Sequence, residues 1–376
     1  CLRVRPNQSP ACPHRIGMGP FFRSQGLLSL TQDLSLSSLG WSNFYLSQLD
    51  ETELSLTFVR VSAVHRDRID GLSPQGPLTL ALAGDLSAGA LAIGDWVLSD
   101  GQRVLRRLDR KTLLSRRAAG TGNAAQLIAA NVDTLFIVTS CIADFNPARL
   151  ERYLALSAEA GTEAVVLLTK ADTSQDAEAY RDKAARMQRG LPVLALDARD
   201  PGIAVRLAEW CRPGQTVALL GSSGVGKTTL TNTLTGLAGA TQAIREDDAR
   251  GRHTTTARSL HAMADGGWLM DTPGMRALGL ADAAAGIDAV FADVTELAWQ
   301  CRFRDCTHQS EPGCAVQQAI AEGHLDGDRL RRWGKLKRED RFNSETAAEA
   351  RQRSRQFGRM VRNSLAEKAR YDGGKR

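Results

Sequence analysis

The chain has 376 residues, of which 43% are hydrophobic and 24% are charged, a composition typical of a folded protein with more than one domain. These values exclude a collagen-like or wholly disordered chain, and no run of about 18 apolar residues is present, so we expect no transmembrane helix. The formal net charge of +6 is concentrated at the end, where residues 331–376 hold 15 Lys/Arg and 6 Asp/Glu. Such a segment favours binding to phosphate groups, and a solvated helix is the alternative.

Residues 1–50 are expected to form an N-terminal extension that is partly disordered. The sequence begins with Cys1, and Leu27–Leu30 is too short for the core of a signal peptide. Residues 1 to about 35 carry no recognisable chemistry, and we interpret them as a disordered extension or as the result of a misplaced start site.

Residues 51–118 contain short β-rich stretches separated by turn residues, which predicts a small β-barrel. The predicted strands are Leu56–Val64, Leu78–Leu82, Trp96–Leu98 and Val104–Leu108, with turns at Gly71-Leu72-Ser73-Pro74 and Ser99-Asp100-Gly101. The last part of this region is basic, with Arg103, Arg106, Arg107, Arg110, Lys111, Arg116 and Arg117. An arginine-edged barrel is typical of oligonucleotide binding, and a solvated strand face explains the charges equally well.

Strands and helices alternate in residues 119–283, which predicts a mostly parallel sheet with helices on both faces. The predicted strands are Val132–Thr139, Val165–Leu168, Val193–Leu196, Thr216–Leu220 and Trp268–Met270. The predicted helices are Pro147–Ala160, Ala177–Arg189 and one that begins at about Gly226.

A phosphate-binding loop is predicted at Gly221-Ser222-Ser223-Gly224-Val225-Gly226-Lys227-Thr228. The stretch matches G-x-x-x-x-G-K-[ST] in full, and it follows a predicted strand and opens a predicted helix, as the motif requires. Glycines let backbone N–H groups surround an oxyanion, and the helix N-terminus adds its positive dipole end. We expect Lys227 to reach the β- and γ-phosphates, the Thr228 hydroxyl to coordinate Mg²⁺, and Thr229 to lie in the same nucleotide site.

Two further stretches are predicted to complete the phosphate site. Asp271-Thr272-Pro273-Gly274 ends a predicted strand, and we expect Asp271 to hold Mg²⁺ while the Gly274 N–H faces the γ-phosphate. Gly251-Arg252-His253-Thr254-Thr255-Thr256 lies between the two motifs. One of its threonines, assigned as Thr255, is expected to complete the Mg²⁺ shell; an ordinary polar loop is the alternative.

A base-reading segment is predicted at Thr169-Lys170-Ala171-Asp172, in the setting where an Asn-Lys-x-Asp segment reads guanine. The Asp172 carboxylate is expected to accept hydrogen bonds from the ring N–H and the exocyclic amine, which adenine does not offer in that arrangement. Thr169 stands where Asn is usual, and Asp197-Ala198 stands where a Ser-Ala pair is commoner. These departures put the affinity of the site in doubt more than its choice of base.

The order of these motifs is reversed relative to ordinary small GTPases, because the base-reading segment precedes the phosphate loop. A circular permutation leaves the packing of a sheet intact, since chain ends lie on the surface. The chain then leaves the nucleotide domain just after residue 274, so the next domain is attached directly to the nucleotide-sensing segment. That connection suits a switch that moves a neighbouring domain.

A metal site is predicted at Cys301-x4-Cys306-x-His308-x5-Cys314. Three thiolates and one imidazole satisfy a tetrahedral Zn²⁺ without an open position, so the site is expected to be structural. Redox cysteines and chance are the alternatives.

Taken together, the permuted order, the stretches at 251–256 and 271–274, and the Cys-Cys-His-Cys spacing resemble the bacterial ribosome small subunit-dependent GTPase A family, the circularly permuted YjeQ/EngC-type GTPases. The likeness covers about residues 36–376, including Leu39-Gly40-Trp41. It implies an N-terminal OB-fold β-barrel, a central circularly permuted α/β P-loop GTPase domain, and a C-terminal α-helical zinc-binding domain at 284–376 with a basic helical tail.

The resemblance also implies a cytoplasmic enzyme that hydrolyses GTP to GDP and phosphate. The 30S ribosomal subunit would stimulate it, and it would assist the late maturation of that subunit, with both flanking domains touching rRNA. We expect one structural Zn²⁺ per chain, Mg²⁺ with GTP, a monomer, and no membrane partner.

Catalysis is expected to depend on His253. Met275 follows Asp-Thr-Pro-Gly where Ras-like proteins have a glutamine, and an apolar side chain cannot orient water. We hypothesise that His253 positions the attacking water once the ribosome orders its loop; contact with rRNA, or plain packing, is the alternative.

Two other classes of protein fit part of the sequence. One is a P-loop ATPase or RNA-remodelling enzyme with zinc, against which Thr169-Lys170-Ala171-Asp172 argues. The other is a non-catalytic RNA-binding scaffold that uses GTP only for stability.

Overall fold

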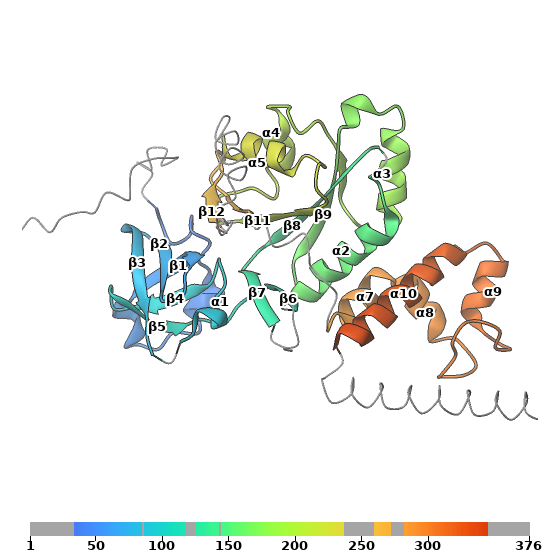
Figure 1. Cartoon of the computed structure of the whole chain (residues 1–376), viewed down its shortest axis with the longest axis horizontal. Helices are drawn as coiled ribbons and strands as arrows, with labels where there is room; N and C mark the ends of the chain where they lie inside the picture. Colours follow the sequence, from blue (N-terminus) through green and yellow to red (C-terminus); the bar gives the residue numbers. More distant parts are fainter. Residues whose placement is uncertain are drawn as a thin grey trace, which may run out of the picture. The chain divides into compact units, whose positions relative to one another are not determined.

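The computed structural model describes residues 34–84, 86–117, 125–142, 144–236, 259–271 and 282–344. Along the chain these residues form a barrel, a sheet covered by helices, and a group of C-terminal helices (Figure 1). Within these ranges no helix combines the length and the apolar character needed to cross a membrane.

A closed barrel of five strands follows the short helix α1 (Asn43–Leu46). The strands are β1 (Thr57–Val64), β2 (Arg68–Ser73), β3 (Gly76–Leu82), β4 (Trp96–Ser99) and β5 (Arg103–Arg107). Their order around the barrel is β1-β2-β3-β5-β4, with β3 and β5 parallel, which is the OB-fold arrangement. The interior is filled by Val59, Val61, Ile69, Leu80, Leu91, Val97 and Val104.

The prediction of a turn at Gly71–Pro74 was wrong, because β2 runs through Ser73. Its hairpin with β3 pairs Ser73 with Gly76 and turns at residues 74–75. Gly71 serves close packing instead: a Cβ there would lie 2.3 Å from Val59 Cγ1. A glycine within a strand thus marks a close approach of two strands here.

Six strands form the central sheet in the order β10-β9-β8-β11-β13-β12, parallel except for the edge strand β12. They are β8 (Thr134–Ser140), β9 (Glu163–Thr169), β10 (Val193–Ala195), β11 (Thr216–Gly221), β12 (Ser259–Ala262) and β13 (Trp268–Asp271). β8 and β11 are buried along their whole length, as expected of central parallel strands. A separate hairpin of β6 (Leu113–Arg117) and β7 (Ala125–Ala130) lies between barrel and sheet in the sequence.

Helices cover both faces of this sheet, as the alternation predicts (Figure 1). One face packs against α2 (Pro147–Ala160) and α3 (Ala177–Ala185), and the other against α4 (Ile203–Leu207) and α5 (Lys227–Thr235). α2 has clear local signals: the Asn146 side chain accepts from the Arg149 N–H at its start, and Gly161 ends it in the left-handed region at φ 75°.

The C-terminal helices share a hydrophobic core with the first face of the sheet. They are α7 (Ala284–Val290), α8 (Ala292–Ala298), α9 (Ala315–Ala321) and α10 (Gly327–Ser344). Val294, Val316 and Leu336 belong to the same cluster as Ile137 and Leu154. α7 lies close against α2, because a Cβ on Gly286 would meet the Ala155 carbonyl oxygen at 2.2 Å.

A buried arginine also joins α10 to α2. Arg329 Nη1 donates to the fully buried Glu151 at 3.1 Å, and Arg329 Nε donates to Asp293 at 2.5 Å. Arg332 Nε donates to the second Glu151 oxygen at 2.7 Å. Both oxygens of Glu151 are therefore paired, which buried charges require.

A second buried arginine, Arg60 of β1, joins the barrel to the sheet. Its Nη1 donates to the Leu39 carbonyl at 2.6 Å, and its Nη2 donates to the Thr216 hydroxyl at 2.5 Å. Burial lowers the pKa of Arg60 to about 10. Trp268 Nε1 adds a hydrogen bond to the Ser38 carbonyl at 2.7 Å.

Candidate nucleotide and metal sites

The carboxyl ends of β8, β9 and β11 meet at one edge of the sheet. β8 and β11 are the two central strands. β9 and β10 extend the sheet on the side of β8, whereas β13 and β12 extend it on the side of β11, so the strand order reverses between β8 and β11. In open α/β sheets this reversal is where ligands bind. The predicted phosphate loop and base-reading segment follow β11 and β9, so the topology brings both to the same edge.

The phosphate loop is shaped by positions that exclude side chains. A Cβ on Gly221 would lie 2.2 Å from the Val138 carbonyl oxygen, so β11 and β8 are too close for any other residue. Gly224 and Gly226 have φ of +81° and +95°, a region that L-residues rarely adopt. The chain thereby forms a tight loop that continues directly into α5.

The loop's lysine lies over the loop itself. Lys227 Nζ donates to the Gly221 carbonyl at 2.7 Å and to the Ser222 carbonyl. The ammonium group is thus held at the mouth of the loop, at the N-terminus of α5, where an anion is favoured by the helix dipole. Thr228 is exposed beside it, and Thr229 is half-buried.

A tyrosine of α2 interacts with the loop. Burial raises the pKa of Tyr153, and a smaller interaction with the Ser222 side chain lowers it. Tyr153 is only 7% exposed. α2 therefore contacts the phosphate loop through Tyr153 and α10 through Glu151.

Thr169 ties the base-reading segment to the phosphate loop. Its hydroxyl lies 2.6 Å from the Val225 carbonyl oxygen and 3.1 Å from that of Thr139, and its side chain is fully buried. A threonine at this position therefore still joins the two motifs. Thr233 of α5 adds a hydrogen bond to the Ala198 carbonyl at 2.9 Å.

Asp172 lies at the surface of the same edge. Lys170 has φ 57°, and the 3-10 turn Ala171–Thr173 follows it. The Asp172 side chain is 32% exposed, and its Oδ2 accepts from Arg199 Nη2 at 2.8 Å. Arg199 also donates to Asp197, whose pKa is lowered by that hydrogen bond. The two departures from the usual motif thus both have partners in this structure.

Several predicted residues of the phosphate site lie outside the described residues. They are His253, Thr254, Thr255, Thr256 and Gly274. Asp271 ends β13, and its side chain is likewise outside the description. Their roles stay predictions.

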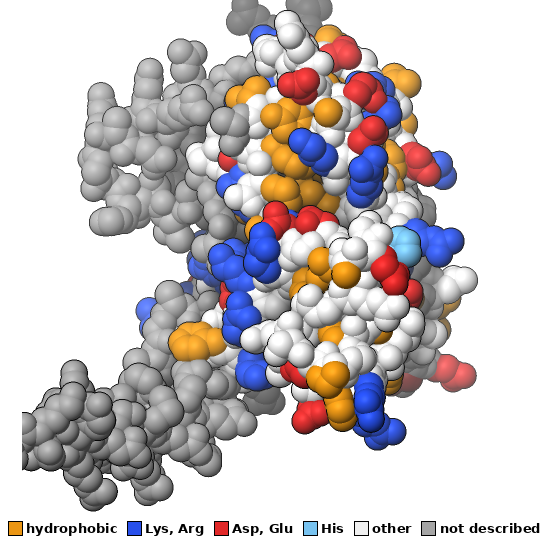
Figure 2. All heavy atoms as spheres, turned by 90° about the vertical axis from the view of Figure 1, so that its right-hand side faces the viewer, with side chains coloured by type: hydrophobic (Ala, Val, Ile, Leu, Met, Phe, Trp, Pro, Cys, Tyr) orange, Lys and Arg blue, Asp and Glu red, His pale blue; other side chains and the backbone are white. Residues whose placement is uncertain are grey.

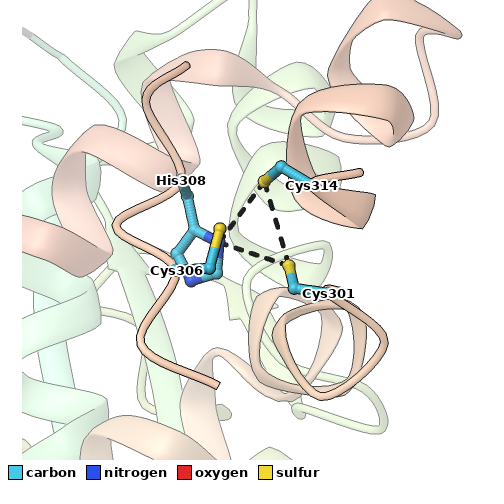
Figure 3. Close-up of side chains that lie close together, drawn as sticks. All are labelled: Cys301, Cys306, His308 and Cys314. Atoms are coloured by element: carbon cyan, nitrogen blue, oxygen red, sulfur yellow. Dashed lines mark hydrogen bonds between the residues drawn. The ribbon is translucent and has the colours of Figure 1, made fainter. Parts of the chain in front are cut away.

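Cys301, Cys306, His308 and Cys314 come together as a compact cluster (Figure 3). One ligand atom from each lies within 4.8 Å of the others. Cys301 Sγ and Cys314 Sγ are 3.8 Å apart, and each lies 3.5 Å from His308 Nδ1. Metal–sulfur bonds of about 2.3 Å at tetrahedral angles place two sulfurs about 3.8 Å apart, so these residues fit one four-coordinate ion.

The loop that carries His308 is organised by Glu311. Its two carboxylate oxygens accept from the backbone N–H groups of Thr307, Gln309 and Ser310 at 2.8, 2.9 and 3.1 Å. A further hydrogen bond from the Thr307 hydroxyl is the largest cause that lowers the pKa of Glu311 to about 2. Gln317 Nε2 donates to the His308 carbonyl at 2.5 Å, which fixes the other side of this residue.

The basic end of the barrel is partly neutralised within the fold. Arg106 pairs with Glu53 at 2.6 Å, and Arg110 pairs with the buried Asp95 at 2.6 Å. Arg103 pairs with Asp100 at 3.1 Å. These arginines therefore also stabilise the barrel.

α10 carries a more open basic face. Arg331, Lys335, Arg338 and Arg341 are exposed, whereas Glu339 pairs with Arg152 and Asp340 accepts from the Ala283 N–H at 2.8 Å. Figure 2 views the molecule from the side of the C-terminal helices and shows Lys and Arg side chains gathered along one edge of the described surface.

Sequence reasoning missed Tyr153, Arg199 and Glu311. Tyr153 lies within an ordinary helix, and only the tertiary fold places it on the phosphate loop. Arg199 and Glu311 are polar residues in polar loops, so their type gives no signal. Only the short sequence separation between Arg199 and Asp197 indicated that these two residues could form an ion pair.

The fold and the loop after β11 define a P-loop protein of the circularly permuted GTPase class. Two crystal structures share this fold: YjeQ from Thermotoga maritima has a TM-score of 0.56 at 22% identity and covers 75% of this chain and 97% of that one. YloQ, described as a circularly permuted GTPase, has a TM-score of 0.57 at 21% identity and covers 79% and 99%.

The family follows from closer relatives. A model of the RsgA GTPase family matches residues 107–281. The small ribosomal subunit biogenesis GTPase RsgA of Mesorhizobium japonicum is 60% identical over 82% of this chain and 91% of its own length. RsgA 2 of Vibrio vulnificus is 48% identical over 91% and 98%. The chain therefore belongs to the RsgA family of GTPases, which hydrolyse GTP.

Proposed function

We propose that this chain hydrolyses GTP to GDP and phosphate on the 30S ribosomal subunit, is stimulated by that subunit, and assists its late maturation. The observation that carries this proposal is the hydrogen bond of Thr169 to Val225, which joins a base-reading segment to a phosphate loop on a permuted sheet. Its relatives are named small ribosomal subunit biogenesis GTPases, and this supports the 30S subunit as the particle on which the chain acts.

Each predicted residue has a role in this proposal. The loop Gly221–Thr229 holds the phosphates, Asp172 reads guanine with Thr169, Lys170 and Ala171 in support, and Thr228, Thr255 and Asp271 hold Mg²⁺ with Gly274 near the γ-phosphate. Mg²⁺ supplies positive charge to the phosphate oxygens when bound. His253 positions the attacking water.

The cysteine cluster holds Zn²⁺ in a structural role, since the four residues leave no open coordination position. The exposed basic face of α10 supports contact with rRNA, because exposed cations favour the phosphate backbone. The proposal also includes three domains, at residues 51–118, 119–283 and 284–376. It further includes a monomeric state and a cytoplasmic location.

Steady-state GTPase assays with and without purified 30S subunits test the proposal. We expect a large increase in kcat with 30S subunits, and ATP should fail to compete with GTP. Turnover that is unchanged by 30S subunits would favour the non-catalytic scaffold, and efficient competition by ATP would favour an ATPase.

A second assay tests the histidine. His253→Ala is expected to keep GTP affinity and lose the stimulated turnover. His324→Ala removes an exposed histidine from the connection between α9 and α10 and serves as the matched control. Equal stimulated turnover in both variants would reject the role of His253.

A further inference from the structure

Arg199 joins two carboxylates at the base end of the nucleotide site. Its backbone N–H and its Nε each donate to Asp197 Oδ1 at 3.0 Å. Its Nη2 donates to Asp197 Oδ2 at 3.0 Å and to Asp172 Oδ2 at 2.8 Å. Asp197 thus accepts two hydrogen bonds from the guanidinium group and one from the backbone N–H of Arg199, and the fourth hydrogen bond reaches Asp172, the predicted base reader.

The charges of this group explain why an arginine is needed there. The negative charges of Asp172 and Asp197 would repel each other if no positive charge lay between them. Arg199 lowers the pKa of Asp197, and the hydrogen bond and charge of Asp197 in turn raise the pKa of Arg199. The positive charge of the Arg199 guanidinium therefore offsets the repulsion between the two carboxylates.

The side chain of Asp197 cannot by itself hold the Asp172 carboxylate, because it has no hydrogen-bond donor. A serine at position 197 has a hydroxyl that can donate to a neighbouring carboxylate, whereas an ionised aspartate can only accept. A carboxylate offers about four lone-pair sites, so Asp172 can accept Arg199 and still accept two N–H groups from a base.

We propose that Arg199, anchored by Asp197, is a positioning residue that holds the Asp172 carboxylate in the orientation that reads guanine. This inference rests on the proposed GTP-binding function. Arg199 is itself 69% exposed, so its effect is that of a surface ion pair on a neighbouring contact.

The test compares two nucleotides that differ at one group. GDP carries the exocyclic amine that Asp172 is expected to bind, and inosine diphosphate lacks it. We expect Arg199→Ala to weaken GDP binding about three- to five-fold and inosine diphosphate binding by less, measured by titration with the full chain. Arg181→Ala, which removes an exposed ion-paired arginine from α3, is the matched control and should change neither affinity.

A rescue variant separates positioning from simple loss of charge. Asp197→Ser with Arg199→Ala restores a hydroxyl donor and removes the extra carboxylate, so GDP affinity should return to within about two-fold of the starting protein. The thermal unfolding midpoint of every variant is measured alongside.

Four outcomes overturn the inference. They are an equal loss for both nucleotides, no loss, a gain in GDP affinity that would make Arg199 a competitor of the base, and failure of the rescue. Failure of the unmodified chain to bind GDP would instead overturn the proposed function, so the two are distinguished.

Discussion

The predicted phosphate end and the predicted base end of the nucleotide site lie on the same sheet edge but are built differently. At the phosphate end, Gly221 and Gly226 set the geometry through the backbone, and a side chain on Gly221 would meet Val138 at 2.2 Å. At the base end, Thr169, Asp172 and Arg199 act through side chains and are joined by hydrogen bonds. A site made by the backbone permits almost no substitution, whereas a site made by side chains can exchange its donors and acceptors. This difference explains why the loop matches its motif in full while the base segment departs from its motif twice.

The largest expected effect comes from Gly221→Ala. The added methyl group would overlap the Val138 carbonyl, so β8 and β11 must separate, at a cost of about 1–3 kcal/mol in unfolding free energy. We expect no measurable nucleotide binding in titrations. Gly84→Ala is the control, since nothing lies within 4 Å of its added Cβ. Near-normal nucleotide binding by Gly221→Ala would contradict the view that the backbone at Gly221 sets the geometry of the phosphate end.

Asp172→Asn is expected to have the next largest effect. An amide cannot accept from both N–H groups of guanine, so GDP affinity should fall at least about 100-fold. Xanthine diphosphate, with an oxygen in place of the amine, should gain affinity. Asp176→Asn, an exposed carboxylate that makes no cap hydrogen bond to α3, should leave both affinities unchanged. Retained GDP affinity in Asp172→Asn would place the base reader elsewhere.

Thr169→Val tests the connection between the two ends. The variant keeps the shape and removes the hydroxyl that bonds Val225, so unfolding free energy should fall by about 1–3 kcal/mol and nucleotide affinity by about ten-fold. Denaturant titration and nucleotide titration measure the two effects. Thr235→Val removes a hydroxyl bonded only within α5 and is the control. Thr169→Asn should bind at least as well as the unmodified chain, and weaker binding would contradict this account.

Removal of the metal is expected to have the smallest effect on nucleotide affinity. A chelator, or Cys314→Ser, should lower the thermal stability of the C-terminal helices. Because α2 contacts both α10 and Ser222, GDP affinity should fall about two- to five-fold, and inosine diphosphate affinity should fall equally. A loss confined to GDP would mean that the base end, and not the phosphate end, is coupled to the metal.

The sequence was informative wherever the backbone or a hydrophobic run decides the structure. The buried strands β8 and β11, the bounds of α2 and the phosphate loop are all visible as patterns. It was less informative where tertiary packing decides. Gly71 looked like a turn but lies within β2, and the β6–β7 hairpin has no strong strand pattern.

At the site the same limit holds for side-chain partners. Residue type identified the four clustered residues that could hold a metal ion, because Cys and His are rare and their spacing is diagnostic. Arg106, Arg110 and Arg199 are common surface residues, and their acidic partners are far away in sequence or carry no motif. Only the folded chain shows which carboxylate each one meets.

Arg60 has a practical consequence for any attempt to divide this chain into separately folding pieces. It fills a buried position against Thr216, the first residue of the strand that ends in the phosphate loop. A truncated chain that lacks the barrel would expose that strand end to water, with Asp133 left beside it without the arginine that offsets its charge. Loss of GTP turnover on deleting the barrel would therefore report damage to β11 and would not by itself show a role of the barrel in ribosome binding. Arg60→Met in the intact chain removes the contact with Thr216 while the barrel remains, so it separates damage to the strand from loss of ribosome binding.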